Sequence, residues 1–512
     1  MNILFVVEQI DIEHLGSMLL AAIIRQQGHY VEVSAATWPS VKRALARKKF
    51  SLIGYSAPTI HYAKYWQINQ IVKKQENIFS IFGGAHPTFA PEIIGDPGVD
   101  CLCRGEGEEA LVELTQCLAA GQRPNKIKNL WIRADSGVEK NPVRPLIEDL
   151  DSLPFPARDL FPQGETFTKG KMHVMTSRGC PYQCSYCSHA AYAGLYGPAA
   201  HRVRRRSAGN VIAEIAAARQ TARVRLVMFE DDLFTSDRHW LNEFCDHYAR
   251  DVALPFFCYV RADTLTKEVI TQLKAAGCVS VSLGVETVNS QARETVLGRH
   301  LDTERIRQAA DLIKKCGMRL ETTNIIGIPG TALEDDFSTM DFNRSLGADY
   351  ASVKMLMPYP GTPLRRWMEQ AGYSLSMPLS GDRLAFVSQD KKYKHCVENL
   401  RWLFGIGATG AWLGRCVRGA APVAGLSAAY RLIFLLWEGY TAYFRLYPTG
   451  ARGFWWGLKK YWGRMVMPVT RKIFFQNRPE ILFAVEQSKT LPEMSAPSQQ
   501  LKDKTCCSRG RS

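Results

Sequence analysis

Residues 176–187 read Thr176-Ser-Arg-Gly-Cys-Pro-Tyr-Gln-Cys-Ser-Tyr-Cys187, and this stretch decides how the rest of the chain is interpreted. Its three cysteines, Cys180, Cys184 and Cys187, supply three thiolates from one short loop. A tetrahedral zinc site needs four ligands, and no His or Cys follows at finger-like spacing to complete the set. Soft thiolates also favour iron–sulfur clusters. Three cysteines on a four-iron cluster leave one iron open to a small molecule. The alternative is a zinc knuckle or three unrelated thiols.

The chain around this loop alternates short apolar runs with helical patterns. Such alternation predicts βα units and parallel strands, and six units predict a partial (β/α) barrel with its chemistry on the loops after the strands. The cysteine loop follows the first strand. Amphipathic helices are predicted at 208–219 and 303–315. The strands are predicted at 173–175, 225–229, 256–260, 279–283, 320–326 and 351–356.

The loop and the segments after it resemble the radical S-adenosylmethionine (SAM) superfamily, whose cluster loop has this spacing and commonly an aromatic residue before the last cysteine. The resemblance implies a [4Fe–4S] cluster on the three cysteines and SAM chelated to the open iron. Family members also place acidic residues after the second strand, and glycines at strand ends let backbone approach a ligand closely. The expected SAM-binding residues are Tyr186, Glu230, Asp231, Asp232, Arg261, Gly284, Glu286 and Gly327.

Residues 1 to about 118 show a second alternating pattern, with apolar runs at 3–7, 31–35, 52–56 and 79–82. A helix at 17–27, closed by Gly28, fits between the first two. The pattern predicts a doubly wound, Rossmann-like parallel sheet, whose ligands bind at the carboxyl ends of the strands.

This first domain resembles the cobalamin-binding fold that precedes some radical SAM cores. Its Gly-Gly-Ala-His-Pro-Thr segment at 83–88 and its Arg-Gly-Glu-Gly-Glu segment at 104–108 carry the resemblance. The motif for a cobalt-ligating histidine is Asp-x-His-x-x-Gly, whereas this chain has Asp11-Ile-Glu-His14-Leu-Gly16, with both intervals shifted by one. The alternative is a Rossmann domain that has lost the corrin. The residues expected to bind cobalamin are His14, Ser56, Thr59, Gly83 and Gly84.

Charge and composition separate the C-terminal part from the rest. The 512 residues carry a net charge of +15, and residues 401–480 hold 12 Lys/Arg against two acids, a net of +10. Aromatic residues are interleaved with these cations. The pattern favours peripheral contact with a membrane surface through 401–480. A plain helical cap on the barrel is the alternative, and nucleic acid is the least favoured partner.

The expected domain organisation follows from these shifts in pattern. It consists of a B12-binding-type Rossmann domain at 1–135, a linker at 136–170, a radical SAM core at 171–375, a helical basic and aromatic domain at 376–484 and a disordered tail at 485–512. The 14 cysteines form no disulfide framework. A cytoplasmic enzyme is expected, with peripheral association at the cytoplasmic membrane face.

Residues 1 to about 372 thus resemble the cobalamin-dependent radical SAM enzymes often called class B methyltransferases. The resemblance implies methylation of an unactivated carbon through a 5′-deoxyadenosyl radical and methylcobalamin. A membrane-facing C-terminal cap would suit a hydrophobic substrate (a lipid, isoprenoid or tetrapyrrole). The resemblance also implies a reductase partner such as flavodoxin or ferredoxin. A cyclase or rearrangement enzyme is the main alternative. A cobalamin sensor is the non-enzymatic one, and the intact cysteine set argues against it.

Overall fold

The computed structural model describes residues 1–375, 385 and 391–441. They all lie in one unit that spans Met1–Phe454. The tail expected at 485–512, and much of the helical domain and membrane-facing segment expected before it, lie outside the described residues. No helix in the described ranges is long and apolar enough to cross a membrane.

The first domain is a seven-stranded sheet in the order β2-β1-β3-β4-β5-β6-β7. Strands β1 to β5 pair in parallel, and β6 and β7 form an antiparallel hairpin at the edge. The doubly wound sheet is confirmed, although the hairpin was not foreseen, and the domain boundary expected at residue 135 falls in its turn. The strands are β1 (Asn2–Val7), β2 (Tyr30–Ala35), β3 (Leu52–Ser56), β4 (Phe79–Gly83), β5 (Cys101–Cys103), β6 (Leu130–Ala134) and β7 (Gly137–Lys140).

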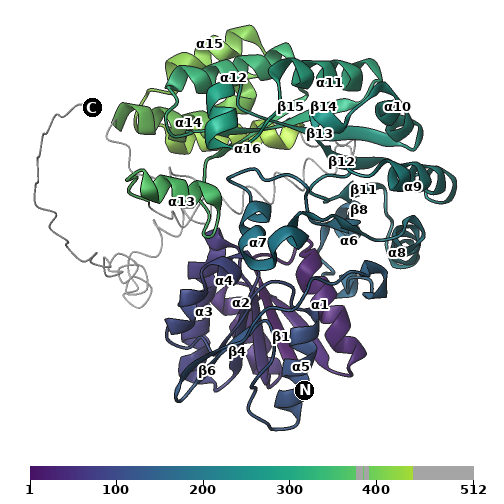
Figure 1. Cartoon of the computed structure of the whole chain (residues 1–512), viewed down its shortest axis with the longest axis vertical. Coiled ribbons are helices and arrows are strands. Elements are labelled where there is room, and N and C mark those ends of the chain that lie inside the picture. Colours follow the sequence, from purple (N-terminus) through teal and green to yellow (C-terminus); the bar gives the residue numbers. More distant parts are fainter. Residues whose placement is uncertain (376–384, 386–390, 442–512) are drawn as a thin grey trace, which may run out of the picture. The chain divides into compact units, whose positions relative to one another are not determined.

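Helices join these strands in βαβ fashion (Figure 1). Buried residues of α1 and α5 pack with Ile3 and Leu52, while α2 and α3 contribute to a separate cluster with Leu4 and Ile53. Since neighbouring residues of a strand point to opposite faces, the sheet is covered on both sides. The helices are α1 (Leu15–Gln26), α2 (Trp38–Arg47), α3 (Tyr62–Gln75), α4 (Ala85–Phe89) and α5 (Glu108–Ala119).

The second domain is an open, all-parallel sheet of six strands in the order β15-β14-β13-β12-β11-β8. All six predicted strands are present in the predicted order, and the partial barrel is confirmed. The predicted helix at 303–315 is α11 (Thr303–Lys315). The strands are β8 (Lys171–Val174), β11 (Leu226–Phe229), β12 (Phe256–Val260), β13 (Cys278–Glu286), β14 (Arg319–Ile326) and β15 (Tyr350–Met355).

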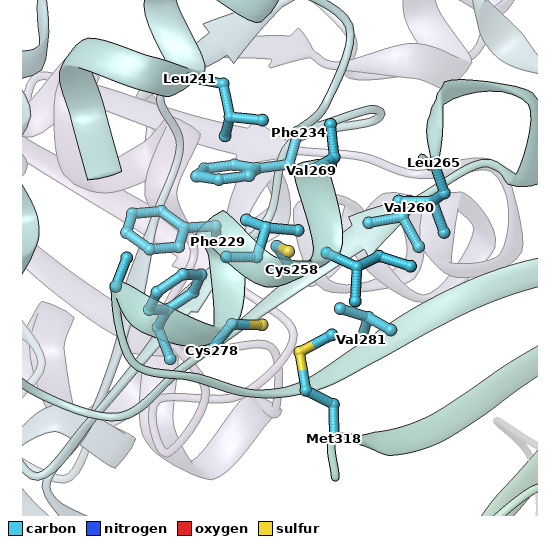
Figure 2. Packing of buried hydrophobic residues seen from close by; sticks show 14 of the residues in the cluster. Phe229, Phe234, Leu241, Cys258, Val260, Leu265, Val269, Cys278, Val281 and Met318 are labelled. Carbon is cyan, nitrogen blue, oxygen red and sulfur yellow. The ribbon is translucent and has the colours of Figure 1, made fainter. Parts of the chain in front are cut away.

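The main core lies between this sheet and its helices, which run along its outer side (Figure 1). Figure 2 shows part of this core, which includes Phe229, Phe234, Leu241, Cys258 and Cys278. In β8, Met172 and Val174 belong to this core, so that the alternate residues Lys171 and His173 face the inner side. The helices are α8 (Ala208–Thr221), α9 (Arg238–Asp251), α10 (Lys267–Ala275), α11 and α12 (Leu333–Ser345).

Shorter elements and three C-terminal helices complete the described chain. Two-residue strands β9 (Ser177–Arg178) and β10 (Arg204–Arg205) pair next to the cysteine loop. Helix α14 packs on β15 and α12, and it contacts both α15 and α16. The remaining helices are α6 (Glu165–Lys169), α7 (Ser188–Tyr196), α13 (Pro363–Gln370), α14 (Lys391–Gly407), α15 (Ala411–Ala420) and α16 (Ser427–Tyr440).

Candidate functional site: a cysteine loop beside a glycine-lined cavity

The cysteine loop connects β9 to α7, and Cys187 is the N-cap residue of that helix. The amide of Cys187 donates to the carbonyl of Cys184 over 3.0 Å. Ser185 fixes the loop to the barrel, because its amide donates to the Leu297 carbonyl (2.9 Å) and its carbonyl accepts from the Leu364 amide (3.0 Å). The loop is thus held in place by the segments that follow the fourth and the sixth strands of the barrel.

The surroundings of the three thiols fit an iron–sulfur cluster. Cys184 is buried, and Nη1 of Arg261 donates to its Sγ over 3.9 Å. Burial raises the pKa of the Cys187 thiol to about 12 and also raises that of Cys180. Thiolates at these positions therefore need positive charge nearby, which Arg261 supplies and bound iron would supply. Within the described chain, no three His, Cys, Asp or Glu side chains are grouped to hold a single metal ion.

The three acidic residues expected at the SAM amino group have three different environments. Glu230 accepts from Nδ1 of His173 (2.7 Å). Asp231 is buried and accepts from both the amide (3.1 Å) and the hydroxyl (2.7 Å) of Thr176. Asp232 is the most exposed of the three and pairs with Nε2 of His189 (2.6 Å). Asp231 thus fixes the strand that leads into the cysteine loop, whereas Glu230 and Asp232 pair with the histidines His173 and His189.

Glu286, at the end of β13, has a backbone φ of +62°, which is uncommon for a residue with a side chain. Its buried carboxylate lies 3.8 Å from Nη1 of Arg299, and burial raises its pKa. Burial, together with the nearby Glu286 carboxylate, raises the Tyr186 pKa well above its ordinary value. A strained, buried residue of this kind is typical of functional sites.

Two glycines of the expected SAM set have roles that the sequence did not reveal. A Cβ on Gly284 would lie 2.5 Å from Nη2 of Arg299, so this glycine makes room for a side chain of the protein itself. Gly327 has a φ of +69°, and its amide donates to the buried carboxylate of Asp336. Their contacts with SAM remain predictions.

A cavity of about 460 Å³ lies at the carboxyl ends of the first domain's strands. It borders β1 and β3, where the strand order reverses, which is the usual ligand site of a doubly wound sheet. Barrel residues form the opposite wall, among them Gly179, His189 and Asp232. One cavity therefore touches both the sheet of the first domain and the cysteine loop of the second. Six glycines line its sheet side, namely Gly16, Gly54, Gly83, Gly84, Gly105 and Gly107.

The glycines leave this wall without side chains, and at two of them the missing Cβ also lets other atoms of the protein pack closely. A Cβ on Gly54 would lie 2.9 Å from the Phe5 ring, and one on Gly84 (φ +96°) would lie 3.2 Å from the Ala57 amide nitrogen. On the barrel side Tyr192 and Tyr196 stack with ring centroids 6.0 Å apart. The mostly apolar, glycine-lined wall with aromatic side chains opposite it suits the cobalamin expected from the sequence.

The five residues expected to bind cobalamin divide into two groups. Ser56, Gly83 and Gly84 line the cavity. His14 and Thr59 are not among the lining residues. Nε2 of His14 lies 2.9 Å from the Gln9 carbonyl oxygen, and burial lowers the His14 pKa. Its role as a cobalt ligand remains a prediction.

Sequence reasoning missed a charged cluster on the cavity wall that joins the two domains. Arg178, two residues before Cys180, donates to Glu106 (2.8 Å) and Glu108 (2.6 Å). Arg204 also donates to Glu106. Burial alone would raise the Glu106 pKa, but the bonds from Arg204 and Arg178 outweigh it and hold that pKa below its ordinary value. The Arg-Gly-Glu-Gly-Glu segment was visible in the sequence, although its partners, about 70 to 100 residues away, were not.

The fold and the site define an α/β enzyme in which a Rossmann-like sheet and a cysteine-bearing partial barrel share one cavity. Residues 174–342 match the model of the Radical SAM superfamily, and residues 2–115 match that of the B12 binding domain. The chain therefore combines a Radical SAM domain with a B12-binding domain. A [4Fe–4S] cluster with SAM, and cobalamin, are the cofactors of domains of these two kinds.

Individual proteins of this kind are similar to the chain over most of its described length. An uncharacterized methyltransferase of Pyrococcus horikoshii is 28% identical over 392 residues, which are 74% of this chain and 83% of that protein. The anaerobic magnesium-protoporphyrin IX monomethyl ester cyclase of Rubrivivax gelatinosus is 27% identical over 339 residues. These residues are 63% of this chain and 59% of the cyclase. The cobalamin-dependent SAM radical enzyme OxsB shares the fold, with a TM-score of 0.63, 17% identity, and coverage of 87% of this chain and 73% of OxsB.

Proposed function

We propose that this protein is a cobalamin-dependent radical SAM C-methyltransferase that acts on an unactivated carbon of a hydrophobic metabolite. The observation that carries the proposal is the shared cavity. Ser56 and Gly83 on the B12-type sheet line the same space as Gly179 and Asp232 beside the cysteine loop. A methyl-carrying corrin on the sheet would therefore lie next to the site where the radical is generated.

When bound, the cluster and SAM supply the hydrogen-abstracting radical, and cobalamin supplies the methyl group. The residues of the chain position these groups and exclude water from the site. Arg178, held by Glu106 and Glu108, fixes the start of the cysteine loop against the first domain. Asp231 fixes the same loop from the barrel side through Thr176 and Ser177. Both domains therefore determine where the three thiols lie.

The proposed substrate class rests on the barrel's inner face and on one relative. Leu226, Met228 and Phe257 form an apolar layer there, with Tyr259 beside it. Farther along the inner face, His173 lies between Glu165 (3.1 Å) and Glu230 (2.7 Å). The side chains of this apolar layer are buried, but the shared cavity is also mostly apolar and suits an apolar molecule with at least one polar group; the Rubrivivax cyclase is named for a tetrapyrrole of that kind. That relative also makes a cyclisation or rearrangement the second candidate.

We further propose that a small electron carrier such as flavodoxin or ferredoxin reduces the cluster, and that the enzyme works in the cytoplasm. An oxygen-sensitive cluster needs a reducing compartment, and the twelve cysteines of the described chain are all free thiols.

Anaerobic reconstitution with iron, sulfide and hydroxocobalamin tests the proposal. SAM and dithionite are then added, with a lipid and tetrapyrrole extract as substrate. Methyl transfer predicts bound corrin and the formation of both 5′-deoxyadenosine and S-adenosylhomocysteine. Cys184→Ala is expected to abolish deoxyadenosine formation because it removes a cluster ligand.

Two further results would separate the competing reactions. Deoxyadenosine with a transformed substrate but without S-adenosylhomocysteine would favour cyclisation or rearrangement. Neither product, despite a formed cluster and bound corrin, would reject the enzymatic proposal and support a cobalamin sensor.

A further inference from the structure

Exposed apolar side chains are concentrated in the C-terminal helices. Eleven large hydrophobic residues are exposed in the described part of the chain, and seven of them lie between Trp412 and Tyr440. Single exposed hydrophobics are normal on a protein surface, but a cluster of this kind indicates an interaction site.

Helix α16 carries most of this cluster on one face. Leu432, Ile433, Leu436 and Tyr440 are between 42% and 53% exposed. Ile433, Leu436 and Tyr440 are three and four residues apart, and Leu432 is four residues from Leu436, which places all four on one side of the helix. Val423 and Leu426, in the turn before the helix, are exposed as well.

The opposite face of α16 is already packed. Phe434 contacts Trp402 of α14, with ring centroids 5.4 Å apart, and Trp437 stacks on Tyr350 of β15 at 5.3 Å. The Tyr430 hydroxyl donates to the Ala420 carbonyl over 2.9 Å. The helix is therefore apolar on both sides, with one side docked on the barrel. A helix that is apolar all round is normally buried on every side.

The charge of the C-terminal residues indicates which kind of surface fits the exposed side of α16. Residues 391–441 contain seven Lys/Arg and two acids, a net charge of +5, and residues 442–479 add eight Lys/Arg and no acid. Arg415 and Arg431 are exposed. Interfacial helices combine an apolar face with nearby cations that attract anionic headgroups. We propose that the exposed face of α16 binds the surface of an anionic lipid bilayer, lying in the interface without spanning it.

Flotation of the full-length protein with lipid vesicles tests this inference, which does not depend on the reaction catalysed. Wild-type protein is expected to float with phosphatidylcholine vesicles that contain about one-third phosphatidylglycerol, and to float less with pure phosphatidylcholine or at high salt. Leu432→Glu/Leu436→Glu is expected to weaken flotation by about tenfold or more, since each 1.4 kcal/mol of lost binding free energy is a factor of ten. Circular dichroism and cluster content confirm that the variant is folded.

A matched variant and the oligomeric state distinguish lipid binding by α16 from binding elsewhere and from self-association. Trp367→Glu introduces a negative charge of the same kind, one in place of two, at an exposed hydrophobic residue of α13 and should float like the wild type. Equal flotation of the Leu432/Leu436 variant would show that α16 is not the contact, and that basic residues elsewhere bind the lipid. A wild-type protein that does not float, but forms a dimer that the α16 variant loses, would show that a second copy covers this face.

Discussion

At the scale of single residues, Gly105 shows how closely the two domains approach at the cavity. Its φ of +77° is one that glycine adopts freely, and a Cβ there would lie 1.8 Å from the hydroxyl oxygen of Tyr196. Gly105→Ala should therefore displace Tyr196 and narrow the cavity. We expect cobalamin affinity to fall by about tenfold or more, measured by absorbance titration of the reconstituted protein.

A double variant distinguishes this steric effect from backbone strain. Tyr196→Phe removes the hydroxyl that the new methyl group would meet. Gly105→Ala/Tyr196→Phe should therefore recover part of the affinity, although the strain of a positive φ, about 1 kcal/mol, remains. No recovery would show that strain, and not the contact with Tyr196, weakens binding.

Arg261 is the residue through which the barrel should tune the cluster. Its guanidinium lies 3.9 Å from the Cys184 sulfur, stacks 3.8 Å from the Tyr182 ring centroid and pairs with Asp263 at 2.9 Å. Positive charge beside a ligand sulfur favours the more negative, reduced cluster. Arg261→Met should thus lower the reduction potential, measured by potentiometric titration with electron paramagnetic resonance.

The lysine variant is the control for this prediction. Arg261→Lys keeps the charge but loses the planar stacking and the paired bonds to Asp263. Its potential should fall less than that of Arg261→Met. Equal potentials in all three proteins, together with poorer cluster incorporation, would mean that Arg261 only supports the fold of the loop.

At the scale of elements, the strands and the cysteine loop could be predicted because their signals are local. Apolar runs between helical patterns indicated all six barrel strands, and the spacing of Cys180, Cys184 and Cys187 indicated the cluster. The β6–β7 hairpin was missed because its strands are short and partly exposed and lie in a polar segment. Long-range partners such as Arg299 for Gly284 could not be predicted, since no local pattern joins residues 15 positions apart.

The contact between β14 and α12 should make stability depend on pH. Asp336, in the first turn of α12, is buried, and burial raises its pKa from 3.8 to about 8. Between these values the unfolded chain has lost the proton while the folded protein keeps it, so stability should fall as the pH rises from about 4 to 8. Asp336→Asn removes this titration and can still accept from the Gly327 amide. The variant should gain on the order of 2–5 kcal/mol over wild type between pH 5 and pH 8, as measured by urea unfolding.

An exposed aspartate serves as the comparison for this pH effect. Asp311→Asn on α11 removes an acidic group of the same type from the surface. The difference in stability between Asp311→Asn and wild type should hardly change across the same pH range. If Asp336→Asn behaved in the same way, the carboxyl of Asp336 would be ionised in the folded protein.

At the scale of the whole molecule, one buried arginine ties the first domain to the barrel. Arg158, in the segment between them, donates to Glu13 of the first domain and to Glu214 of α8, both over 2.6 Å. It also donates to the carbonyl of His173 on β8. Arg158→Met should cost about 3–5 kcal/mol because it leaves the Glu13 carboxylate buried without its cation. Differential scanning calorimetry measures the loss.

The neighbouring pair Arg25–Asp159 is a surface control for this prediction. Its side chains are 38% and 65% exposed, so Arg25→Met should cost less than about 1 kcal/mol. If Arg158→Met and Arg25→Met lost similar amounts of stability, the buried ion pairs of Arg158 would contribute no more than a surface pair. Recovery of stability in Glu13→Gln/Arg158→Met would locate the cost in the unpaired carboxylate.

The cavity is the feature at this scale that sequence reasoning could not supply. Each wall was foreseen separately, as glycines after β4 and as acidic residues after β11. The two walls come together only because the two domains pack against each other. The Arg178–Glu106 and Arg178–Glu108 bonds that fix this packing join residues at least 70 positions apart. Only the folded chain shows that both sets border one space.

The buried Arg158 network limits how this chain could have been assembled or can be redesigned. A cassette cut at the end of the first sheet would carry Glu13 without its arginine, and a barrel cassette that began at β8 would lack it as well. Exchanging the corrin-binding half with that of a relative should therefore succeed only when the crossover point preserves all three partners. The two domains resemble separable modules in sequence, but the buried contacts of Arg158 couple them in the folded chain.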